Sequence, residues 1–122
     1  MFDTVTAIHP HVKSGALRAL AVLTAKRSEA APVVPTMGEA GMTGYATSTW
    51  GGILAPARTP PEIVAKLAAE ISKALGSADV RHRLISAGID PGDGSPQQFT
   101  NFIQTEMVKW AQVATSAGIQ PE

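Results

Sequence analysis

Only two stretches of this 122-residue sequence have the pattern of a β-strand that is covered on both faces. Residues 17–23 and 50–55 are short apolar runs with little polar alternation, which is typical of buried strands in α/β proteins. The remaining recognisable segments are helical, so strands and helices alternate and predict α/β architecture. A doubly wound sheet needs more than two strands, and the sequence therefore predicts only part of such a fold.

Five segments carry helix signals, each beginning at a Ser or Thr and ending at or near a Gly. Thr59 and Ser95 are expected as N-caps, each directly before a proline in the first helical position, with capping boxes closed by Glu62 and Gln98. Pro10 is expected within the first turn of its helix, where a missing N–H is tolerated. The predicted helical segments are residues 6–13, 36–41, 59–76, 77–88 and 95–118.

The last predicted helix has an apolar face at helical spacing, and the sequence predicts that this face is buried. The face consists of Phe99, Phe102, Ile103, Met107, Trp110 and Val113.

The composition excludes several classes of function. Ten basic residues balance ten acidic ones, so the basic surface of a nucleic-acid-binding protein is missing. The absence of cysteine excludes thiol nucleophiles, disulfides and cysteine-ligated metals. The longest apolar stretch is too short to span a bilayer. Met1 is followed directly by Phe2 and Asp3 without the pattern of a signal peptide, so we expect either a cytosolic chain or a lost N-terminus.

Candidates for chemistry are weak. His9 and His11 have no third ligand nearby, and an i,i+2 pair on a helix is splayed apart, so we predict no metal site. The serines lack a matching base and acid, and Gly51-Gly52 lacks the Lys-Ser/Thr end of a phosphate loop. We therefore predict no catalytic residues, no cofactor and no enzymatic activity.

The start of the chain is the best candidate for ligand binding. Residues 1–4 resemble a strand running into a helix, and backbone N–H groups at such a junction can capture an anion. On this hypothesis Thr4, Val5 and Thr6 offer amides or hydroxyls to a solute or bridging water. Asp3 would repel a carboxylate, so its expected role is helix capping or contact with a ligand amino group. Ordinary capping chemistry explains the same residues equally well.

Several short motifs follow one another along the chain. They are Met1-Phe2-Asp3, Pro10-His11-Val12-Lys13-Ser14-Gly15, Leu17-Arg18-Ala19-Leu20-Ala21-Val22, Val34-Pro35-Thr36, Glu39-Ala40-Gly41, Gly44-Tyr45 and Trp50-Gly51-Gly52-Ile53-Leu54-Ala55-Pro56-Ala57. Their order and spacing resemble the substrate-binding proteins of tripartite tricarboxylate transporters, the TctC or Bug solute receptors. The resemblance covers nearly the whole chain; Arg58 stands where Gly is usual, and Gly51 replaces a commoner aromatic or polar residue.

The resemblance implies part of a type II periplasmic-binding-protein fold, in which two lobes close on a small carboxylate solute. Residues 1–45 would form the end of the second lobe. Residues 46–122 would supply the crossover strand and the C-terminal helices of the first lobe. Family members are well over twice as long and begin with an export signal. The resemblance therefore implies a C-terminal portion of a periplasmic receptor that works with membrane permease subunits.

The resemblance also places the predicted ligand-binding residues at the cleft. These are Phe2, Asp3, Thr4, Val5, Thr6 and Trp50. For Trp50 a core position is the favoured alternative, because tryptophans are more often packed than ligand-binding. The chain alone is expected to bind solute weakly or not at all. The alternative function is a self-associating interaction domain, in which exposed sheet edges promote a homodimer.

Overall fold

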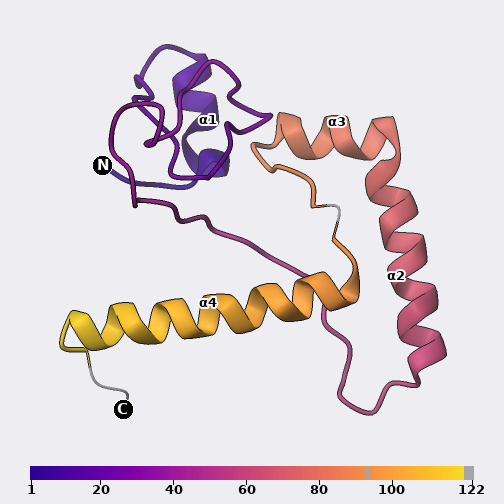
Figure 1. Cartoon of the computed structure of the whole chain (residues 1–122). Coiled ribbons are helices and arrows are strands. Elements are labelled where there is room, and N and C mark those ends of the chain that lie inside the picture. Colours follow the sequence, from indigo (N-terminus) through magenta and orange to yellow (C-terminus); the bar gives the residue numbers. More distant parts are fainter. Residues whose placement is uncertain (93, 120–122) are drawn as a thin grey trace. The chain divides into compact units, whose positions relative to one another are not determined.

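The computed structural model describes residues 1–92 and 94–119, which fall into two compact units (Figure 1). The first unit, Met1–Gly92, contains α1 (Val5–Lys13), α2 (Pro61–Gly76) and α3 (Ala78–Ser86). The described part of the second unit contains α4 (Pro96–Ser116). The predicted lobe boundary between residues 45 and 46 stays a prediction, and residues 93 and 120–122 of the predicted first-lobe segment lie outside the described residues.

Helix α1 begins after Thr4, whose side chain accepts a hydrogen bond from the Ala7 amide. The predicted helix is confirmed, but Pro10 lies beyond the first turn, contrary to the prediction. A proline there removes the N–H that would bond the carbonyl of Thr6 four residues earlier. The helix therefore contains one missing backbone hydrogen bond.

Helix α2 confirms the predicted segment but corrects its first residues. The N-cap is Pro60, without a side-chain cap bond, and the helix begins at Pro61, so the predicted cap at Thr59 and capping box with Glu62 are wrong. The reason is the second proline: a residue that precedes proline is pushed out of the α region, and Pro60 accordingly has ψ 136°.

Ser77 joins α2 to α3. Its hydroxyl donates to the Ala74 carbonyl at 2.8 Å and accepts from the Val80 amide at 3.4 Å, so one side chain ends α2 and caps α3. Helix α3 ends before Gly88, which has φ +78°, as the sequence predicts. Helices α2 and α3 also contact each other.

The two predicted strands do not form as strands. Within the described residues the pairing is limited to a single parallel bridge between Val22 and Thr36. Residues 50–55 are extended but unbridged, so the predicted crossover strand is wrong for this structure. A strand needs a neighbour to accept its backbone hydrogen bonds, and the Val22 amide finds one in the Pro35 carbonyl at 2.8 Å.

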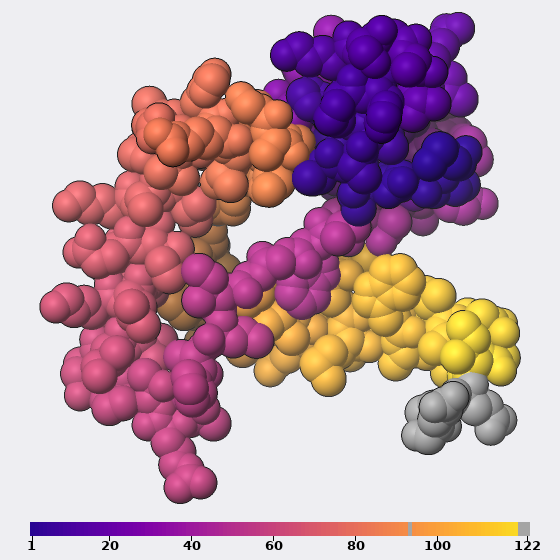
Figure 2. Space-filling model, turned by 180° about the vertical axis from the view of Figure 1, so that it is seen from behind, coloured from indigo at the N-terminus to yellow at the C-terminus, as the bar shows by residue number. Residues whose placement is uncertain are grey.

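The most buried side chains lie in the loops between α1 and α2. Val22 and Val34 are the buried apolar residues, and Ser28 and Thr36 are buried polar ones. Figure 2 shows the N-terminal part of the chain, in indigo and purple, gathered into one body, with the end of α3 and the residues after it, in orange, against it. The N-terminal loops thus hold the small core of the first unit.

Helix α4 opens with the predicted capping box, in which the Ser95 and Gln98 side chains each bond the other's backbone amide. Its predicted burial is wrong for this structure. Trp110 is 46% exposed and Met107 is 68% exposed, because the described residues of this unit, 94–119, contain no second element against which the apolar face could pack. None of the helices in residues 1–92 and 94–119 combines the length and apolarity that a bilayer crossing needs.

Candidate functional site

The first turn of α1 has the capping geometry that the sequence predicts. The Thr4 amide donates to Asp3 Oδ1 at 2.7 Å, and Thr4 Oγ1 accepts from the Ala7 amide at 3.3 Å. Thr4 is therefore the N-cap of α1, and the Asp3 side chain bonds the Thr4 amide just before the helix. The Asp3 carboxylate folds back on the amide that follows it.

Two amides at this helix start are left for another partner. Neither the Val5 nor the Thr6 amide has an acceptor within residues 1–92 and 94–119, as expected for the first amides of a helix. The first turn contains no acidic side chain, so its positive end is not neutralised from within the helix. This turn can accept a carboxylate oxygen from outside the helix.

Thr6 has a second contact that sequence reasoning missed. Its hydroxyl donates to the Gly88 carbonyl at 3.3 Å, across 82 residues of sequence. The hydroxyl hydrogen is therefore engaged. A solute can use the Thr6 amide or the lone pairs of its hydroxyl oxygen.

The two predicted aromatic residues are both accessible. Phe2 is 82% exposed, directly before the turn. Trp50 is 43% exposed on the extended segment that follows Thr47, whose amide bonds the Leu23 carbonyl at 2.9 Å. The favoured core position for Trp50 is therefore wrong in this structure, and its ligand contact stays a prediction.

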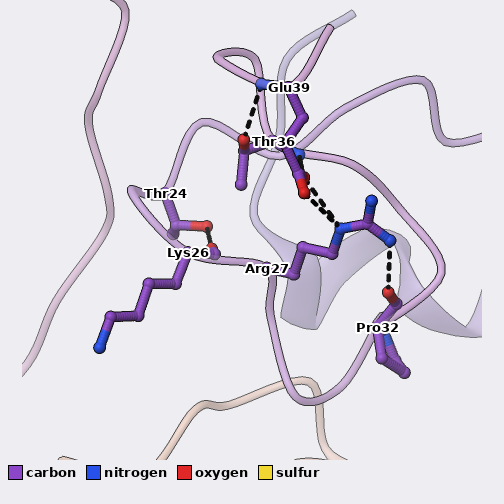
Figure 3. Close-up of polar contacts among 6 residues, drawn as sticks. All are labelled: Thr24, Lys26, Arg27, Pro32, Thr36 and Glu39. Carbon is purple, nitrogen blue, oxygen red and sulfur yellow. Dashed lines mark hydrogen bonds and ion pairs between the residues drawn. The ribbon is translucent and has the colours of Figure 1, made fainter.

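A separate polar cluster stabilises the loop between the core residues (Figure 3). Arg27 Nε donates to both carboxylate oxygens of Glu39, at 3.1 and 2.9 Å, and its Nη1 donates to the Pro32 carbonyl at 3.2 Å. Glu39 also accepts from the Thr36 amide at 2.8 Å while Thr36 Oγ1 accepts from the Glu39 amide, which confirms the predicted capping box.

The same cluster shifts two pKa values. The hydrogen bond from Arg27, followed by that from the Thr36 backbone, holds the pKa of Glu39 below its ordinary value. The hydrogen bond and charge of Glu39 in turn raise the pKa of Arg27. The cluster thus favours the charged form of both side chains, as expected of a structural ion pair.

Asp90 forms a second cluster that no local sequence signal could have found. Its Oδ1 accepts from Ser28 Oγ at 3.0 Å and from the Glu29 amide at 2.8 Å. Beside it, Arg81 Nη2 lies 2.9 Å from both carboxylate oxygens of Glu29. Ser28 is only 2% exposed, so Asp90 satisfies a buried hydroxyl from 62 residues away.

No cluster that could hold a metal ion is assembled in the described part of the chain. His9 and His11 lie on α1, and no three side chains of His, Cys, Asp or Glu gather at one point among the described residues. The first turn of α1 is the arrangement with the most defined binding chemistry.

Comparison with known proteins matches almost the whole chain. The family model described as "Tripartite tricarboxylate transporter family receptor" covers residues 1–119. Protein BugT of Bordetella pertussis is 37% identical over 116 residues, which is 95% of this chain and 36% of BugT. A Pseudomonas sp. protein from the tcbD–tcbE intergenic region is 36% identical over 90% of this chain and 33% of its own length. The chain thus spans about a third of the length of each of these two relatives.

Solved structures agree in fold. The structure "R. palustris Rpa4515 with adipate" superposes with a TM-score of 0.80 and 40% identity, covering 97% of this chain and 40% of that one. MatC from Rhodopseudomonas palustris, with bound malate, gives a TM-score of 0.71 and 34% identity over 89% of this chain and 38% of that one. The periplasmic binding protein BugD gives 0.78 and 26% identity over 94% of this chain and 39% of that one.

Proposed function

The chain belongs to the tripartite tricarboxylate transporter receptor family, and on that premise we propose that it forms part of the solute-binding site of a dicarboxylate receptor. The supporting observation is the first turn of α1, where the Val5 and Thr6 amides lack an acceptor among the described residues. Two adjacent amides without an acceptor at the positive end of a helix suit one carboxylate group.

The class of solute is supported by the structural neighbours. One of them carries adipate and another malate, and both of these solutes have two carboxylates. We place one carboxylate on the amides of Val5 and Thr6, with the Thr4 hydroxyl beside it. Phe2 and Trp50 are proposed to contact the carbon chain of the solute, because both rings are accessible. The proposal involves binding only, with no chemical step.

The partners and location follow the same proposal. A receptor of this family would deliver its solute to membrane permease subunits. We propose the periplasm as the compartment, since BugD is named a periplasmic binding protein. In lobe terms, residues 1–45 would belong to the second lobe and residues 46–122 to the crossover and first lobe.

The test is a titration in a complete receptor frame. The 122-residue chain replaces the matched 40% of Rpa4515, and calorimetry measures binding of adipate, malate and the uncharged analogue 1,6-hexanediol. We expect binding of at least one dicarboxylate and none of the diol. A folded hybrid receptor that binds no dicarboxylate, while Rpa4515 itself binds adipate, would contradict the proposal.

A self-associating role is the second candidate. Ile53 and Leu54 are 75% and 76% exposed on the extended segment, and such a segment can pair with a second copy through its backbone. Light scattering on the purified 122-residue chain tests this idea: a concentration-dependent dimer supports it, and a monomer at every concentration rules it out.

A further inference from the structure

Residues 88–90 contact two segments that lie far away in the sequence. The Gly88 carbonyl accepts from Thr6 Oγ1 at 3.3 Å, and Asp90 Oδ1 accepts from Ser28 Oγ and the Glu29 amide at 3.0 and 2.8 Å. This short turn therefore links the start of α1 to the loop that contains Ser28.

The contact with α1 also depends on shape. Gly88 is buried, and a Cβ added to it would lie 2.8 Å from Thr6 Cα and 3.1 Å from the carbonyl carbon of Val5. Backbone therefore packs directly on backbone, which only glycine allows. The residues that Gly88 touches are the same two whose amides form the candidate site.

We infer that residues 88–90 position the solute-binding turn, with Gly88 supporting Val5 and Thr6 and Asp90 holding residues 88–90 in place. The link to binding rests on the proposed function, but the mechanical coupling does not. Asp90 can do this because one oxygen of its carboxylate, Oδ1, accepts hydrogen bonds from both Ser28 and Glu29, which are neighbours in one loop. Neither Gly88 nor Asp90 needs to touch the solute.

The same contacts join α3 to the N-terminal segment that contains α1. The Arg81–Glu29 pair adds a contact from the body of α3 to the Ser28 loop, beside those of residues 88–90. The predicted lobe boundary between residues 45 and 46 falls, in chain order, between α3 and the N-terminal segments that it contacts.

Hydrogen–deuterium exchange on the full 122-residue chain tests the coupling. We compare Asp90→Ala, which removes the acceptor, with Asp90→Asn, which keeps an Oδ1 acceptor. The control is Asp79→Ala, which removes a carboxylate from the first turn of α3 and breaks its exposed pair with Arg83. In Asp90→Ala the Ala7 and Ile8 amides, which bond the Thr4 carbonyl, should exchange about tenfold faster, the factor expected when charge-assisted hydrogen bonds are lost. Asp90→Asn should restore most of the protection, and Asp79→Ala should change nothing in α1.

Two outcomes would overturn the inference. One is unchanged exchange at the start of α1 in Asp90→Ala. The other is an equal acceleration at the Glu39 and Ala40 amides of the 36–41 turn, which would show a general loss of stability. If Asp90→Ala does not fold, Thr6→Val against Thr6→Ser makes the same comparison, because only serine keeps the donor to Gly88.

Binding is measured separately, in the hybrid receptor. Asp90→Ala should weaken dicarboxylate affinity about tenfold while Asp90→Asn restores it, again the scale of a lost charge-assisted bond. If the parent hybrid binds no dicarboxylate, the proposed function fails while the exchange result still decides the coupling. If the parent binds and Asp90→Ala binds equally well, the positioning role is wrong.

Discussion

Thr6 and Gly88 are joined by a 3.3 Å hydrogen bond and by direct backbone packing, although 82 residues separate them. This contact links the first helix of the chain to the turn after its third. The geometry of the candidate site therefore depends on Gly88, a residue without a side chain.

Gly88→Ala should destabilise the first unit. The new methyl group would lie 2.8 Å from Thr6 Cα, and the backbone at φ +78° is itself strained for alanine, so we expect a loss of about 2 kcal/mol in unfolding free energy. Urea denaturation followed by circular dichroism measures it. Gly76→Ala is the matched control: its Cβ meets nothing within 4 Å, and alanine favours the helix, so its stability should not fall.

Val5→Pro should weaken dicarboxylate binding in the hybrid receptor. Proline at the first helical position removes only the Val5 N–H, and Thr4 already has the extended geometry that a following proline requires, φ −73° and ψ 147°. Loss of one amide to a carboxylate should cost about tenfold in affinity by calorimetry. Val5→Ala loses the side chain but keeps the amide, so its affinity should stay near the parent value; equal affinity for all three proteins would exclude the amide from the site.

Glu39→Gln should make the melting temperature of the chain depend less on pH between pH 7 and pH 3. The pKa of Glu39 is lowered in the folded chain from its ordinary value of 4.5, chiefly by the Arg27 hydrogen bond. A depressed folded pKa means stability that is present above pH 4.5 and is lost as the pH falls through the lower, folded value. The parent should therefore exceed Glu39→Gln in melting temperature at pH 7, and the difference should shrink toward pH 3.

The control for that measurement is Glu70→Gln, which removes an exposed carboxylate from α2. Its difference from the parent gives the effect of removing a carboxylate that lies outside the Arg27–Glu39 cluster, and the Glu39→Gln profile is compared with it at each pH. A Glu39→Gln profile parallel to that of the parent would show that the Arg27–Glu39 pair contributes nothing to acid sensitivity.

Pro10→Ala should stabilise α1. Alanine restores the N–H that can bond the Thr6 carbonyl and removes the clash with that turn, so we expect a gain of about 1 kcal/mol, reduced from the full proline penalty by the greater freedom of the unfolded chain. Slower amide exchange across residues 5–13 would report it. Exchange that is unchanged or faster in α1 would mean that the proline ring itself is needed for packing.

Local signals explain most of what the sequence predicted correctly. Ser77, Ser95 and Thr36 each cap a helix or turn with neighbours three residues away, and such contacts can be read from the chain order. The predicted cap at Thr59 failed because two prolines follow it, and the second excludes the first from the helix.

The predictions that failed depend on partners that no local pattern specifies. A strand at residues 17–23 requires neighbours on both sides, and only Val22 is bridged among the described residues. The spacing of apolar residues on α4 gives it an apolar face, but whether that face is buried depends on a second surface that the spacing does not specify. The contacts of Asp90 with Ser28 and of Thr6 with Gly88 span 62 and 82 residues, beyond any spacing rule.

Ser77 limits how this part of the chain can vary in length. Because its hydroxyl both ends α2 and caps α3, no spare residue lies between the two helices to absorb an insertion. One extra residue within α2 would turn everything after it by about 100° around the helix axis. Arg81 would then face away from Glu29, and substitutions should be tolerated here far more readily than changes in length.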